Sequence, residues 1–136
     1  MIEIRYSPPN DLEVSGTVDE LQTIRRRILD MTEAPASKIV LEANSAVDPT
    51  PYNSTLTRLS VQLSNGPAKV SVWDEEVCVE GSREALEAFA SFFNFEPDAT
   101  ERSHLHYEYY DGNEWIDPGS VPLVIRVKKS NGRLSA

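Results

Sequence analysis

Apolar and polar residues alternate in short runs along most of the chain, and a period of two is typical of β-strands. Ile2 and Ile4 start the first run, and Val70 and Val72 start a similar run in the second half. Turn-forming residues such as Pro, Gly, Asn and Asp separate many of the runs. The pattern predicts eight strands: one through Ile2 and Ile4, one through Val70 and Val72, and others at 12–16, 39–43, 57–64, 77–81, 104–110 and 121–128.

Two segments instead repeat their apolar residues every three or four positions, as amphipathic helices do. Each follows a strand that ends at a glycine. The residue directly after that glycine, Thr17 or Ser82, is a favourable helix N-cap. Glu20, three residues after Thr17, completes a capping box. The predicted buried stripes are Leu21, Ile24, Ile28 and Met31 in the first helix, and Leu86, Phe89, Ala90 and Phe93 in the second.

The chain repeats this plan once. Residues 12–21 and 77–86 carry the same strand-glycine-helix pattern at an offset of 65 positions. Each predicted helix also has two strands before it and two after it. We therefore predict two ββαββ units, at about 1–65 and 66–130, which meet at the turn sequence Asn65-Gly66-Pro67.

These elements indicate a single α+β domain over residues 1–136. Its duplicated ββαββ units would form an antiparallel-dominated sheet, curved or split in two, with two helices packed on it. A sheet that carries helices on one side only leaves a face that needs cover or a partner. A short basic tail at 128–136 contains Lys128, Lys129 and Arg133.

The size and composition are those of a soluble globular domain with one core: 136 residues, 40% apolar and 26% charged. Its apolar runs are far shorter than the roughly 20 residues that cross a bilayer. The start of the chain lacks a signal-peptide pattern, and its single cysteine fits a reducing compartment. We therefore expect a cytoplasmic protein that binds no membrane.

The charge distribution narrows the class of partner. Acidic residues outnumber Lys and Arg by 22 to 13, so the net charge is −9. Residues 69–125 alone hold 13 acids and three bases, a net charge of −10. Such a field repels nucleic acid and favours fast capture of a basic partner. The other interpretation is that the acidity only keeps the protein soluble.

Both histidines lie in the strand predicted at 104–110. In that strand His104, His106, Glu108 and Tyr110 would project from one face. Two imidazoles and a carboxylate are the residue types of a metal site, but the chain has no third histidine to complete it. We expect no metal and no cofactor. The alternative, a small-ligand or metal-binding domain that uses the His104, His106 and Glu108 face, remains open.

The repeat gives a conflicting orientation for this strand. At the offset of 65, His104 and His106 align with Ile39 and Leu41, which look like core positions. That register would turn the histidines inward and Tyr107 outward. A slip of one residue would exchange the two faces, so the sequence leaves both orientations open.

Signs of catalysis are weak. Cys78 lies in an alternating strand among acidic residues, which raise a thiol pKa and so disfavour a reactive thiolate. No serine lies in a Gly-x-Ser-x-Gly motif, and no glycine-rich phosphate loop is present. We therefore predict that the protein is not an enzyme.

The loop at 111–120 has the composition of a contact surface. Trp115 lies among acidic residues there, and an aromatic anchor ringed by carboxylates suits a cationic partner. The other interpretation is that Trp115 folds inward and fills the core. The residues that we predict to bind a partner are His104, His106, Glu108, Tyr110, Asp111, Glu114, Trp115 and Asp117.

Three segments of the second half resemble a known family. They are the Gly81-Ser82 helix start through Phe93, the His-x-His-x-Glu-Tyr run at 104–109, and the Ser-x-Pro-Leu-Val-Ile strand at 120–125. Together they are similar to the immunity protein 32 family, small immunity proteins of bacterial polymorphic toxin systems. The first half shares the likeness only through the repeat.

The resemblance implies a cytoplasmic antidote that binds a cognate secreted toxin and blocks its active site. Many toxins of such systems are nucleases with basic clefts, which would suit the acidic 69–125 segment, and others are peptidases or deaminases. The sequence also leaves open a self-associating module that forms a homodimer.

Overall fold

The computed structural model describes residues 1–34 and 38–129. Within these residues the chain forms two α-helices, one 3₁₀ helix and nine strands. The helices are α1 (Val18–Glu33), α2 (Arg83–Ala90) and η1 (Ser91–Phe93). The strands are β1 (Glu3–Ser7), β2 (Asp11–Gly16), β3 (Lys38–Glu42), β4 (Ser54–Thr55), β5 (Arg58–Leu63), β6 (Lys69–Trp73), β7 (Glu76–Gly81), β8 (His104–Tyr107) and β9 (Leu123–Val127).

The strands form two sheets that each draw on both halves of the chain. One sheet has the order β4-β1-β2-β9-β8, and the other has the order β3-β5-β7-β6. β2 pairs with β9 in parallel, and β5 pairs with β7 in parallel, whereas the remaining pairs are antiparallel. The predicted α+β class and the split, mostly antiparallel sheet are therefore confirmed.

The order of elements departs from two equal ββαββ units. β4 lies between β3 and β5 in the first half, whereas η1 follows α2 in the second half. Neither element has a counterpart at the same place in the other half of the described chain. The duplication therefore stays a prediction.

Hydrogen bonds join the two sheets at both of their sides. On one side the Asn44 N–H donates to the Ile2 carbonyl oxygen at 2.8 Å. On the other side the Val121 N–H donates to the Val70 carbonyl oxygen at 2.9 Å. The two sheets therefore enclose one continuous core, which the helices complete.

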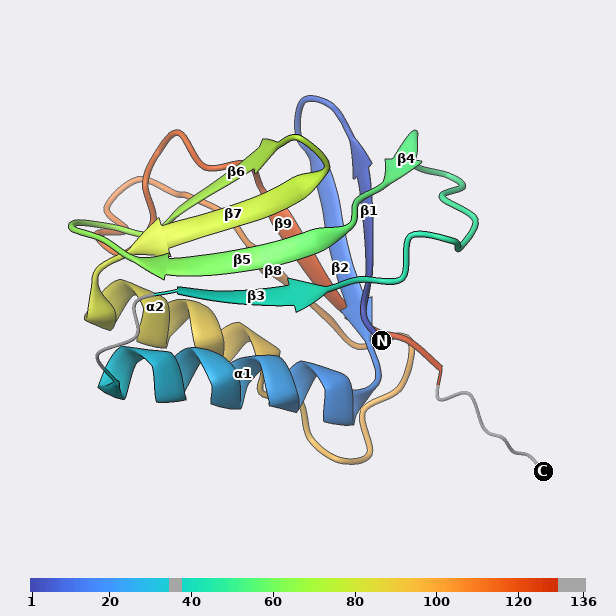
Figure 1. Cartoon of the computed structure of the whole chain (residues 1–136), viewed down its shortest axis with the longest axis horizontal. Helices are drawn as coiled ribbons and strands as arrows, with labels where there is room; N and C mark the ends of the chain where they lie inside the picture. The colour runs from blue at the N-terminus through green and yellow to red at the C-terminus, as the bar shows by residue number, and fades with distance from the viewer. Residues whose placement is uncertain (35–37, 130–136) are drawn as a thin grey trace.

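The helices lie side by side along one side of the sheets, as Figure 1 shows. α1 packs against β2 of one sheet and β3 of the other, and α2 packs against β7. Thr17 caps α1 with the predicted capping box, and Ser82 caps α2 by accepting from the Ala85 N–H. The predicted stripes are buried throughout: Leu21, Ile24, Ile28 and Met31 on α1, and Leu86, Phe89, Ala90 and Phe93 on α2 and η1.

Gly81, which ends β7, allows two backbone segments to approach closely. A Cβ atom at this position would lie 2.8 Å from the Cα atom of Ala68, too close for any larger residue without movement. The next N–H, from Ser82, donates to the Gly66 carbonyl oxygen at 2.9 Å. The close approach thus fixes the start of α2 against the turn that begins the second half.

The strand predicted at 104–110 is shorter than expected, because β8 ends at Tyr107. Its partner β9 starts only at Leu123. The next residue whose N–H would reach β8 is Val121, and that N–H bonds instead to Val70 of β6. Glu108 and Tyr110 therefore leave the strand and enter the loop.

In the described parts of the chain, neither helix has the length and apolar character that crossing a membrane requires. Lys128 and Lys129 of the predicted basic tail are described, and Lys128 bonds to Glu3 and Glu20. The remainder of that tail, at 130–136, lies outside the described residues.

Candidate partner-binding surface

The two histidines point to solvent from the edge strand β8. His104 and His106 are exposed, whereas Tyr107 is only 1% exposed. The inward orientation that the repeat suggested for the histidines is therefore wrong. The Tyr107 ring packs edge-on against Phe89 and Phe92, with ring centroids 4.9 Å apart in each case. Burying this aromatic area fixes the register, because a slip of one residue would expose it.

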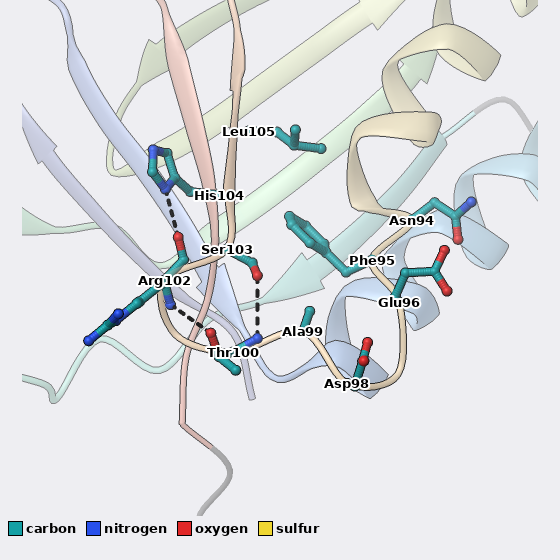
Figure 2. Close-up of a pocket in the computed structure, with 10 residues that line it drawn as sticks. All are labelled: Asn94, Phe95, Glu96, Asp98, Ala99, Thr100, Arg102, Ser103, His104 and Leu105. Carbon is teal, nitrogen blue, oxygen red and sulfur yellow. Dashed lines mark hydrogen bonds between the residues drawn. The ribbon is translucent and has the colours of Figure 1, made fainter.

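The two histidines and Glu108 lie loosely spaced and exposed along the edge of the sheet. Their ring centroids lie 5.2 Å apart. The His106 Nδ1 atom lies 4.0 Å from the Glu108 Oε1 atom, and both side chains are more than half exposed. His104 Nδ1 bonds to the Arg102 carbonyl oxygen at 3.1 Å, as Figure 2 shows. Across residues 1–34 and 38–129, no group of three or more His, Cys, Asp and Glu side chains could hold a metal ion.

A hollow of about 290 Å³, which we name the aromatic hollow, opens between the end of β8, α2 and the 110–116 loop. Four of the predicted binding residues line it, including Trp115, which is 43% exposed, and Tyr110, which is 66% exposed. The inward position proposed for Trp115 is taken instead by the neighbouring Ile116, which is buried. The predicted residues that meet here are His106, Glu108, Tyr110 and Trp115.

The other predicted residues have different surroundings. Asp111 and Glu114 are exposed on the same loop and make no hydrogen bond or ion pair with the described residues. Asp117 is half-buried, and its Oδ1 atom accepts from the Gly119 N–H at 2.7 Å. Asp117 therefore shapes the turn, and its role in binding a partner stays a prediction.

His104 lines a second, larger and more open hollow of about 630 Å³, which we name the open hollow. Its wall is the loop that connects η1 to β8 (Figure 2). Phe95 and Leu105 supply apolar surface, and Glu96 and Asp98 supply negative charge. The sequence does not indicate this hollow, because the loop has no regular pattern of apolar residues.

A contact with α1 holds that loop in place. The Gln22 side-chain amide donates to the Asn94 Oδ1 atom at 2.8 Å and to the Phe95 carbonyl oxygen at 2.9 Å. The open hollow therefore has a fixed wall.

The outward face of the five-stranded sheet carries a charged pair that no local sequence pattern indicates. Glu13 is only 8% exposed, and its Oε1 atom accepts from Arg126 Nε at 2.9 Å and from the Tyr52 hydroxyl at 3.2 Å. Burial raises the pKa of Tyr52, and the Glu13 carboxylate raises it further. Tyr52 also faces His106 and Glu108 across a third hollow, of about 200 Å³. His106 and Glu108 thus stand between the aromatic hollow and this one.

Comparison with known proteins gives a family match that covers the aromatic hollow. The family model described as Immunity protein 32 matches residues 76–128. The matched part contains β7, α2, β8 and β9, and with them every residue that lines the aromatic hollow. The search of curated proteins and the search of solved structures each found no match. The resemblance to the immunity protein 32 family is therefore confirmed over residues 76–128, and it supports a role as an immunity protein.

Proposed function

We propose that the protein is a non-enzymatic antidote of the cytoplasm that binds a cognate toxin and occludes its active site. The match to Immunity protein 32 carries this proposal, because the matched residues hold the whole aromatic hollow. The contact surface would centre on His106, Glu108, Tyr110 and Trp115, with Asp111 and Glu114 at its rim.

The chemistry of the surface favours a basic partner. Trp115 and Tyr110 offer exposed aromatic area for an anchor, which is how binding hot spots are commonly built. Glu108 lines the same hollow, and the exposed Asp111 and Glu114 are chain neighbours of Tyr110 and Trp115, within a segment whose net charge is −10. A toxin with a basic cleft, such as a nuclease, would be attracted by this field and would lose access to its substrate once bound. Nucleic acid itself would be repelled.

A pull-down tests the proposal. Tagged protein is exposed to lysate of the source organism at low and at moderate salt, and bound proteins are identified by mass spectrometry. We expect one dominant basic partner that is lost as salt rises, because salt screens the exposed charges. An empty pull-down at both salt concentrations would contradict the proposal.

Two tryptophan variants locate the contact. Trp115→Ala removes the anchor of the aromatic hollow, and we expect it to weaken capture by about 2 kcal/mol, or roughly 30-fold. Trp73→Ala is the matched control, because Trp73 is 76% exposed on β6 of the other sheet. Equal losses in both variants would place the contact elsewhere.

The geometry gives no support to a metal-binding role for the histidine face. His106 and Glu108 are 4.0 Å apart and exposed, and no third ligand approaches them among the described residues. Metal titration of the protein and of the His104→Ala/His106→Ala variant separates the two functions, because occlusion needs no ion.

A further inference from the structure

β8 is the last strand of its sheet, and one of its two edges is unpaired. The Val127 N–H donates to the Ser103 carbonyl oxygen, so these two residues form a hydrogen-bonded pair just before the strand. Hydrogen-bonded and non-bonded pairs alternate along an antiparallel ladder. In the register that pairs His104 with Arg126, the non-bonded positions of β8 are His104 and His106. Their backbone N–H and C=O groups therefore point away from β9.

These outward groups have no backbone partner within residues 1–34 and 38–129. Proteins usually protect such edges with lysine or proline, and β8 (His-Leu-His-Tyr) contains neither. The edge is thus a template of two N–H and two C=O groups that is ready to pair with another strand.

Two hollows lie along this edge at the spacing of a strand. Leu105 lines the open hollow, and Tyr107 lines the aromatic hollow. Figure 2 shows Leu105 on the side of β8 that faces Phe95, with His104 on the opposite side. Residues two apart in a strand are separated by about 7 Å. An added strand would therefore place alternate side chains, at positions i and i+2, in the two hollows.

The hydroxyl of Tyr107 supplies a second pointer to an occupant. Tyr107 lines the aromatic hollow, and its hydroxyl is buried without a hydrogen-bond partner among the described residues. Buried polar groups are normally paired, and an unpaired one costs stability. A polar atom of an entering side chain could satisfy it.

The negative charge around the free edge of β8 favours a basic segment over a second copy of this chain. Glu96 and Asp98 line the open hollow, where Arg102 is the one Lys or Arg in the lining, and Glu108 lines the aromatic hollow. A second copy of this chain would bring like charges together, since the protein has a net charge of −9. A segment with basic side chains would instead be attracted from both hollows.

We propose that an extended segment of the partner protein, basic at alternate positions, adds to the free edge of β8 and places those side chains in the two hollows. This inference rests on the proposed toxin-binding function and names how the toxin is held.

The test uses a defined probe, a capped peptide of alternating lysine and valine, titrated at low salt into the full-length isotope-labelled protein. We expect saturable NMR shifts centred on the backbone amides of His104 and His106, with slowed hydrogen exchange at both. The same peptide with N-methylated valines is the control for main-chain pairing. We expect it to bind about tenfold more weakly, because blocked N–H groups cannot bond to the edge.

A pair of variants separates backbone from side chain. His106→Ala removes the imidazole and keeps the outward N–H, whereas His106→Pro removes both and is tolerable because edge strands accept proline on their unpaired side. We expect the Pro variant to bind the peptide about tenfold more weakly than the Ala variant. If the Pro variant fails to fold, the N-methylated peptide still decides the matter.

Three results would overturn the inference. They are no binding at millimolar peptide, shifts that leave the His104 and His106 amides unmoved, and edge shifts that depend on protein concentration alone, which would indicate a homodimer. A partner captured equally by His106→Pro and His106→Ala, but lost with Trp115→Ala, would end the edge inference and leave the proposed function standing.

Discussion

Tyr107 is the residue that sets the orientation of the predicted binding face. Its ring is packed between aromatic residues of α2 and η1, and its hydroxyl is buried without a partner in the described structure. Burial raises the pKa of this hydroxyl well above its usual range, so it stays neutral at physiological pH. The residue therefore contributes its ring to the core and carries the cost of an unpaired polar group.

Removing that hydroxyl should stabilise the protein. We expect Tyr107→Phe to raise the free energy of unfolding by about 1 kcal/mol, because an unpaired buried hydroxyl costs about that much or more. Tyr52→Phe is the matched control with the opposite sign, since it removes a hydrogen bond to Glu13. Urea denaturation measures both changes. A loss of stability in Tyr107→Phe would mean that the hydroxyl has a partner.

Residues whose roles depend on near neighbours could be predicted from the sequence. The cap at Thr17 and the buried stripe from Leu21 to Met31 follow from spacing within one helix. The Glu13–Arg126 pair could not be predicted, because its members are 113 positions apart. The bond from Gln22 to Asn94 spans 72 positions and was missed for the same reason.

At the scale of single elements, the two helix starts differ in their caps. α1 has a reciprocal capping box, in which the Thr17 side chain accepts from Glu20 and the Glu20 side chain accepts from Thr17. α2 has one side-chain bond, to Ser82. We expect Thr17→Ala to lower the free energy of unfolding by about 1 to 2 kcal/mol, and Ser82→Ala by about 1 kcal/mol or less. Denaturant unfolding of both variants checks the order, and the reverse order would contradict it.

An ion pair joins the first strand to Lys128, the residue that follows β9. Glu3 bonds to Lys128 Nζ at 3.1 Å and to Arg5 at 2.9 Å. Burial alone would raise the pKa of Glu3, but its bonds to Lys128 and Arg5 outweigh burial and hold the pKa below its ordinary value of 4.5.

The lowered pKa of Glu3 predicts that the stability of the fold depends on pH in the acid range. A carboxylate whose pKa is lower in the folded than in the unfolded state stabilises the fold above the unfolded pKa. That contribution is lost as pH falls from 4.5 through the lower folded value. We expect Glu3→Gln to reduce the fall in the free energy of unfolding between pH 4.5 and lower pH. Glu114→Gln, at an exposed position without an ion pair among the described residues, should leave it unchanged. If the free energy of unfolding fell equally at acid pH in the wild type and in Glu3→Gln, Glu3 would not be the source of this pH dependence.

Element length was predicted well only where local signals end the element. Gly16 and Gly81 ended β2 and β7 as expected, because each is followed by a helix cap. The length of β8 was overestimated, since its end depends on the bond from Val121 to Val70 in the other sheet. The alternation of apolar and polar residues does not show where the pairing with a neighbouring strand ends.

At the scale of the whole molecule, the class of fold was predictable and the pairing of strands was not. Alternation and helix periodicity gave an α+β domain, and this is confirmed. The parallel pairs β2–β9 and β5–β7 join opposite halves of the chain, and no local pattern specifies them. The open hollow depends on this arrangement, because it forms where the loop after η1 meets the edge strand of a sheet from both halves.

The acidic field should control how fast a basic partner binds. Added salt should slow association more than it speeds dissociation, because screening weakens long-range steering more than contact packing. Stopped-flow or surface-based kinetics over a salt series with the captured partner measures both rates. An association rate that does not change with salt would count against steering by this surface.

Protection of living cells tests the central claim most directly. The basic partner recovered by pull-down is produced in cells alone, with the wild-type protein, with the Trp115→Ala/Glu108→Lys variant, or with Trp73→Ala. The account predicts that the partner alone stops growth, that wild type and Trp73→Ala restore it, and that the double variant does not. A partner that is harmless alone, or protection by the double variant equal to that of wild type, would contradict an immunity role exerted through this surface.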